Sequence, residues 1–171
     1  MTALFPVDLI HEAEALLAEL KRRGLRLATV ESCTGGLVAG LLTEIAGASA
    51  VFERGFVTYS DSSKAALLGV APDLIDQHGA VSEAVARAMA EGALARAPVD
   101  VAVAVTGIAG PDGGSPEKPV GLVHFAAAPR GRPTLVREYR FGSIGRTAIR
   151  LASVRAAVEL ARRAVSSQGR D

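Results

Sequence analysis

The sequence predicts an α/β protein, specifically a three-layer α/β/α sandwich around a mixed, mainly parallel sheet. Helical and strand-like patterns alternate along the 171 residues. Several strand-like segments are short, apolar and rich in Val, which is typical of strands buried on both faces. The last two are joined by a short turn, which adds an antiparallel pair to the sheet. We expect one stand-alone domain over residues 1–171, with its core at about 8–165.

The first part of the chain predicts two helices and two strands. Residues 7–23 carry apolar side chains along one helical face, and Gly24 ends this helix. The short apolar segment 26–30 predicts a buried strand. The apolar segment 34–47 predicts a helix, and 51–59 predicts a second strand.

The middle of the chain predicts three helices followed by a strand. Two short helices are expected at about 62–68 and 73–78. Ser82 followed by Glu83 predicts the start of a longer helix, which continues to about residue 97. The Val-rich segment 100–105 predicts the central strand.

The last part of the chain predicts a hairpin and a helix. A Gly/Pro-rich loop at 107–119 precedes a strand at 120–127. The more polar segment 134–141 predicts an edge strand antiparallel to its neighbour. Residues 145–165 carry apolar side chains at helical spacing and predict the final helix.

Composition excludes several functional classes. The net charge of +1, without a basic tract or an aromatic ladder, argues against nucleic-acid binding. No apolar run reaches the roughly 20 residues of a membrane helix, so no membrane partner is expected. The three histidines are far apart and share no ligand spacing with the cysteine, so we expect no dedicated metal site, which leaves only weak magnesium binding by carboxylates. The glycine motifs match neither a Walker A loop nor GxGxxG, so we expect no cofactor. The single cysteine fits a reducing compartment, and we expect a cytoplasmic location.

A candidate nucleophile lies where the first strand meets the next helix. Ser32 precedes Thr34, Gly35 and Gly36, whose N–H groups at a helix start stabilise an alkoxide or an oxyanion. A purely structural alternative makes Ser32 or Thr34 only a helix N-cap. Cys33 is a rival nucleophile, but the sequence places no histidine beside it.

A candidate base follows the second strand, in the polar segment from Tyr59 to Lys64. A serine without a histidine needs another base, and a lysine serves if burial or a nearby cation lowers its pKa. The structural alternative is a solvated surface lysine.

Two further segments suggest ligand binding. The glycine-rich loop 106–114 turns N–H groups toward an anion or a carbonyl, and Thr106 lies at the end of the central strand. Arg146 and Arg150 share one face at the start of the last helix. Cations are unfavourable there, which indicates an anionic partner such as a phosphate, unless this is an ordinary solvated face.

Together these segments resemble the CinA C-terminal domain family, whose enzyme members are nicotinamide-nucleotide amidases. The resemblance covers roughly residues 8 to 165. It rests on ESCTGG at 31–36, YSDSSK at 59–64, VTGIAGPDGG at 105–114 and KPVGLV at 118–123.

The resemblance implies hydrolysis of nicotinamide mononucleotide to nicotinic acid mononucleotide and ammonia. It implies Ser32 as nucleophile, Lys64 as base, Tyr59 and Thr106 as supporting catalytic residues, and Arg146 as a functional arginine. It also implies a homo-oligomer. The predicted substrate-binding residues are Thr34, Gly35, Gly36, Gly107, Gly110 and Arg146.

The chain departs from the family pattern at two places. Asp61 stands where members usually have Asn, and its negative charge favours the protonated form of Lys64. Ile144-Gly145 stand before Arg146 where members usually have Gly-Asp. The alternative function is a non-catalytic nucleotide-binding or regulatory module that uses the same glycine loop and arginine.

Overall fold

The structure is a computed structural model, and it describes residues 4–166. Five strands form one sheet in the order β2-β1-β3-β4-β5. The strands are β1 (Leu27–Glu31), β2 (Phe52–Val57), β3 (Val101–Gly107), β4 (Leu122–Pro129) and β5 (Leu135–Arg140). β1 pairs in parallel with β2 and β3, whereas β4 pairs antiparallel with β3 and β5. Four strands therefore share one direction, and the mixed, mainly parallel sheet is confirmed.

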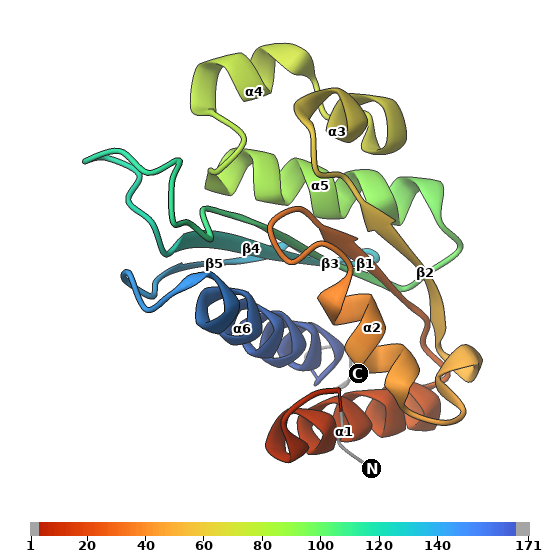
Figure 1. Cartoon of the computed structure of the whole chain (residues 1–171). Coiled ribbons are helices and arrows are strands. Elements are labelled where there is room, and N and C mark those ends of the chain that lie inside the picture. Colours follow the sequence, from red (N-terminus) through yellow and green to blue (C-terminus); the bar gives the residue numbers. More distant parts are fainter. Residues whose placement is uncertain (1–3, 167–171) are drawn as a thin grey trace.

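Helices cover both faces of the sheet (Figure 1). On one face lie α1 (Val7–Arg23), α2 (Leu37–Glu44) and α6 (Arg146–Ser166). On the other lie α3 (Asp61–Leu68), α4 (Pro72–His78) and α5 (Glu83–Arg96), and a short 3-10 helix, η1 (Ala48–Ala50), precedes β2. The predicted three layers are thus confirmed. None of the helices in the described part of the chain combines the length and apolar character that crossing a membrane requires.

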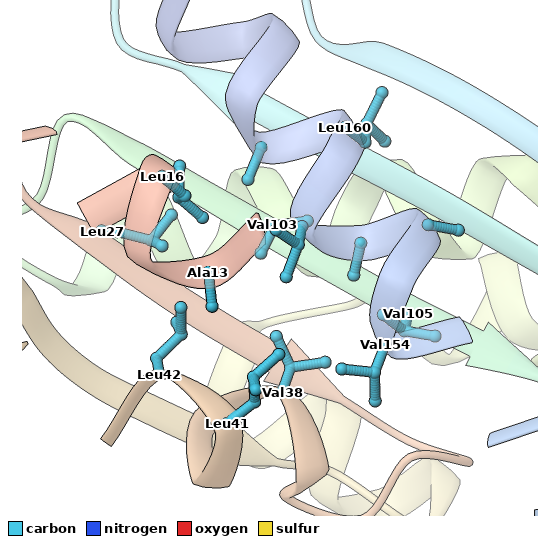
Figure 2. Packing of buried hydrophobic residues seen from close by; sticks show 14 of the residues in the cluster. Ala13, Leu16, Leu27, Val38, Leu41, Leu42, Val103, Val105, Val154 and Leu160 are labelled. Carbon is cyan, nitrogen blue, oxygen red and sulfur yellow. The ribbon is translucent and has the colours of Figure 1, made fainter. Parts of the chain in front are cut away.

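The larger apolar cluster fills the space between the sheet and helices α1, α2 and α6 (Figure 2). Leu16 of α1, Leu41 of α2 and Val154 of α6 meet Val103 and Val105 of β3 in this layer. These side chains are buried completely or nearly so, and each large aliphatic group buried in this way stabilises the fold by about 1.5–3 kcal/mol. The packing holds the N-terminal turns of α2 and α6 at one edge of the sheet.

Most helix ends lie where the sequence places them, because their signals are local. Gly24 ends α1 with φ 66°, and the Ser82 hydroxyl accepts a hydrogen bond from Val85 N at the start of α5. The exception is α2, which spans Leu37–Glu44 rather than residues 34–47. Gly35 and Gly36 have φ of 59° and 99°, a left-handed backbone that a right-handed helix cannot include, so residues 33–36 form a turn.

Candidate active site

A cavity of about 290 Å³ opens at the edge of the sheet where β1, β2 and β3 end. This is the edge at which open α/β sheets bind ligands. Its volume is close to the lower end of the range for small-molecule sites. Of the predicted site residues, those that line it are Ser32, Tyr59, Lys64, Thr106, Gly107, Gly110 and Arg146. Thr34, Gly35 and Gly36 do not line it.

The structure brings Ser32 and Lys64 together from segments 32 residues apart. Ser32 directly follows β1, and its backbone N–H donates to the carbonyl of Val105 on β3. Lys64 lies in α3, whose start is capped by the Ser60 hydroxyl. The Lys64 Nζ atom lies 3.4 Å from Ser32 Oγ. The candidate nucleophile and the candidate base therefore lie in one cavity.

The Lys64 side chain is almost completely buried, with 1% of its surface exposed. This burial lowers the pKa of its amine because the charged form loses its hydration. The carboxylate of Asp61, 3.7 Å from Nζ, raises the pKa and offsets part of this effect, but the net direction is downward. The Nζ atom also donates to the carbonyl of Thr58 at 2.9 Å. These contacts exclude the solvated surface lysine that composition alone favours.

Cys33 also lines the cavity, but its chemistry is unsuited to attack. Burial raises the pKa of its thiol to about 11. The thiolate, which is the reactive form, is therefore scarce at neutral pH. This favours Ser32 over the neighbouring cysteine as the nucleophile.

The N–H groups of Gly35 and Gly36 are not free to bind a ligand. Gly35 N donates to Ser32 O at 3.0 Å. The buried carboxylate of Glu31 accepts from Gly36 N, Val38 N and Ala39 N, at 2.9–3.0 Å. Glu31 thus caps α2, a role that sequence reasoning missed. A carboxylate just before a glycine turn and a helix was the available signal.

The glycine-rich loop after β3 contributes backbone groups to the cavity. Ala109 and Gly110 line it, and their N–H groups donate to no acceptor within residues 4–166. The Thr106 hydroxyl donates to the carbonyl of Ala80 at 2.8 Å and so joins the end of β3 to the segment before α5. The loop can therefore present N–H groups to an anion or a carbonyl.

Both arginines at the start of α6 turn toward the site, but they contact different loops. Arg146 donates from Nη1 to Gly110 O at 2.8 Å and from Nη2 to Tyr59 Oη at 3.1 Å. Arg150 donates to the carbonyls of the turn that follows Ser32, at 3.0–3.1 Å. Neither is an ordinary solvated cation. The sequence placed both on one face of the helix, but not the loops that they reach.

Within the described range, no three His, Cys, Asp or Glu side chains are grouped so that they could hold a metal ion.

The chain is similar in sequence to several bacterial proteins. The nicotinamide-nucleotide amidohydrolase PncC of Escherichia coli strain K12 is 55% identical over 132 residues, which is 77% of this chain and 80% of that protein. A putative competence-damage inducible protein of Symbiobacterium thermophilum is 65% identical over 117 residues, 68% of this chain. The chain spans only 27% of the length of that protein, and 29% of a CinA-like protein of Akkermansia muciniphila.

The fold is also shared with a solved structure. The competence/damage inducible protein CihA from Agrobacterium tumefaciens, whose crystal structure is known, is 54% identical in sequence to this chain. The two structures match with a TM-score of 0.91 over 93% of this chain and 96% of that one. Residues 10–165 match the CinA C-terminal domain. This match spans nearly the whole sequence, and the chain therefore belongs to the CinA C-terminal domain family.

Proposed function

We propose that this chain hydrolyses the carboxamide of nicotinamide mononucleotide to nicotinic acid mononucleotide and ammonia, with Ser32 as nucleophile and Lys64 as base. The observation that carries the proposal is the 3.4 Å approach of a buried lysine to a serine in the cavity. The name of the Escherichia coli relative, a nicotinamide-nucleotide amidohydrolase, supports the substrate class.

Lys64 acts in its neutral form. A neutral amine has two N–H bonds and one lone pair. The carbonyl of Thr58 accepts one N–H group at 2.9 Å and the carboxylate of Asp61 lies 3.7 Å from Nζ, which leaves the lone pair for the Ser32 hydroxyl at 3.4 Å. Lys64 then takes the proton from Ser32 as the serine oxygen attacks the carboxamide carbon.

The tetrahedral oxyanion forms beside backbone N–H groups. Cys33 follows the nucleophile and lines the cavity, and in acyl-transfer sites the N–H of this next residue is a frequent oxyanion donor. The N–H groups of Ala109 and Gly110 lie on the opposite loop of the same cavity. Backbone donors fixed in this way stabilise charge without reorganising during the reaction.

Breakdown of the intermediate completes the reaction. The C–N bond breaks, the proton held by Lys64 passes to the nitrogen, and ammonia leaves an ester on Ser32. A water molecule gives its proton to Lys64 and attacks this ester, and the acid departs as the proton returns to Ser32. The sum is amide plus water to acid plus ammonia, and neither a metal nor a cofactor takes part. Thr106 orients the amide in this scheme.

Arg146 holds the 5′-phosphate. Two of its five N–H groups donate to Gly110 O and Tyr59 Oη, and the others remain for an anion. Tyr59, 61% exposed, borders the cavity on the side of this arginine. The proposal also includes a cytoplasmic location and a single domain. It further includes self-association into a homo-oligomer, and sedimentation of the purified chain would test this self-association.

The test is ammonia release from nicotinamide mononucleotide by the purified chain. The wild type should release ammonia, and Ser32→Ala should release none above the uncatalysed rate. Cys33→Ala is the matched control and should keep most of the activity. A wild type that binds the nucleotide in calorimetry but does not turn it over would favour a non-catalytic binding module.

A further inference from the structure

The side chain of Arg150 makes contacts to the turn beside the nucleophile that the proposed mechanism does not use. Its Nε donates to Cys33 O at 3.1 Å and its Nη2 donates to Thr34 O at 3.0 Å, across 117 and 116 residues of sequence. A guanidinium is a planar fork with donors in fixed directions, so two such bonds fix the orientation of both carbonyls.

The two carbonyls differ in whether Arg150 is their only hydrogen-bond donor within the described residues. Thr34 O also accepts a hydrogen bond from Leu37 N at 3.2 Å. Cys33 O accepts from no other donor in the part of the chain that the structure describes. Cys33 is buried, and without the guanidinium its carbonyl would lack a partner and turn to find one.

Rotation of that carbonyl would disturb the groups that face the substrate. The turn is closed by a bond from Gly35 N to Ser32 O at 3.0 Å, so its peptide planes are coupled. Each peptide is rigid and planar, and the Cys33–Thr34 plane cannot rotate without changing the backbone on either side of it. The N–H of Cys33, the proposed oxyanion donor, belongs to this turn.

We infer that Arg150 is a positioning residue that holds the turn after Ser32 in the geometry required to stabilise the oxyanion. The inference rests on the proposed function. Arg150 differs from Arg146, one helical turn before it, because Arg146 lines the catalytic cavity and Arg150 does not. Arg150 instead borders a second, mainly apolar cavity beside Phe5 and Leu37. It therefore acts through the backbone rather than on the substrate.

The first measurement separates kcat from KM. Arg150→Met keeps the aliphatic stem and removes the donors, and it should lower kcat about 10- to 100-fold while KM changes less than about threefold. Arg150→Lys, whose ammonium lacks the fork, should recover only part of this loss. The acidic limb of the pH profile should stay at the wild-type position, since Lys64 is untouched.

The matched control is Arg155→Met on the same helix. Arg155 pairs with Asp8, at 2.6 Å, and with Glu12 on α1, away from the cavity. This variant should lower the thermal unfolding temperature but keep the wild-type kcat. It shows what the loss of an α6 arginine does when only stability is affected.

The second measurement does not require a nucleotide. A fluorophosphonate probe labels Ser32 by forming a P–O bond as fluoride leaves and Lys64 takes the serine proton, and its phosphoryl oxygen requires the same oxyanion donors. Labelling should be about tenfold slower in Arg150→Met and unchanged in Arg155→Met. If the wild type is labelled but releases no ammonia, the proposed function fails and the labelling rates still decide the role of Arg150.

Three results would overturn the inference. Wild-type kcat and labelling in Arg150→Met would show that the turn needs no support. A loss confined to KM would make Arg150 a substrate-binding residue. A wild type that neither reacts with the probe nor releases ammonia would refute both proposals, because Ser32 would then not be a nucleophile.

Discussion

The contact between Asp61 and Lys64 should influence the pH range in which this chain releases ammonia. In the proposed mechanism the active form of Lys64 is the neutral amine, and the carboxylate of Asp61 raises the pKa of that amine. Replacing Asp61 by Asn keeps the shape of the side chain and removes the charge. The pKa of Lys64 should fall further, and more of the lysine should be neutral at any pH below the midpoint of its titration.

The size of the effect follows from the separation of the charges. Asp61 Oδ1 lies 3.7 Å from Lys64 Nζ, and the aspartate side chain is 61% exposed. An exposed partner is screened by water, so a dielectric constant close to that of water applies, and the attraction is about 1 kcal/mol. This corresponds to about fivefold in the ratio of neutral to protonated lysine.

The assay is kcat/KM for ammonia release across a pH series, which reports the free enzyme. On the acidic limb, Asp61→Asn should be about fivefold more active than the wild type, and the two should converge at high pH. Asp112→Asn is the matched control, because Asp112 borders the same cavity without pairing with Lys64. An acidic limb at the wild-type position, or one displaced to higher pH, would refute the reasoning.

Substitutions at four further positions test the base, the helix cap and the packing. Lys64→Met should abolish ammonia release. Lys64→Arg should not restore it, because a guanidinium keeps its proton. Turnover in the Lys64→Arg variant would exclude lysine as the base. Glu31→Gln should lower the free energy of unfolding in a urea titration by about 1–3 kcal/mol, since an amide replaces a carboxylate that accepts three N–H groups, and an unchanged value would contradict this role. Gly92→Ala should destabilise the fold by about 1–3 kcal/mol, because its Cβ would lie 2.2 Å from Leu68 O. Gly40→Ala is the control, because its Cβ would meet nothing closer than 3.6 Å, and it should stabilise the fold by about 0.5–1 kcal/mol. Equal changes in the thermal unfolding temperature of the Gly92→Ala and Gly40→Ala variants would contradict the packing argument.

Features governed by neighbouring residues could be predicted from the sequence. The bounds of α1 and α5 follow from apolar periodicity and from Gly24 and Ser82, which act within one turn of the helix end. The central place of β3 follows from its continuous apolar run, and the edge place of β5 from its polar residues. Ser32 and Lys64 could be proposed as a pair because a serine without a histidine needs another base, and because the family motifs at 31–36 and 59–64 carry both residues.

Features that depend on distant contacts could not be predicted in this way. Glu31 ends a strand whose five residues are all buried, and nothing local shows that its carboxylate turns back to α2. Gly36 therefore seemed available as an oxyanion donor. The carbonyls that Arg150 contacts lie more than 100 residues before it, so only the folded chain identifies them.

The position of Glu31 also bears on the orientation in which the proposed nucleotide substrate would bind. In many nucleotide-binding proteins, the amino end of the first helix after a strand receives the phosphate. Here the carboxylate of Glu31 occupies that place and already accepts the N–H groups at the start of α2. A phosphate at this helix end would therefore meet a like charge and find these N–H donors occupied. For the proposed substrate, this would direct the phosphorylated end toward α6 and leave the uncharged carboxamide to approach Ser32.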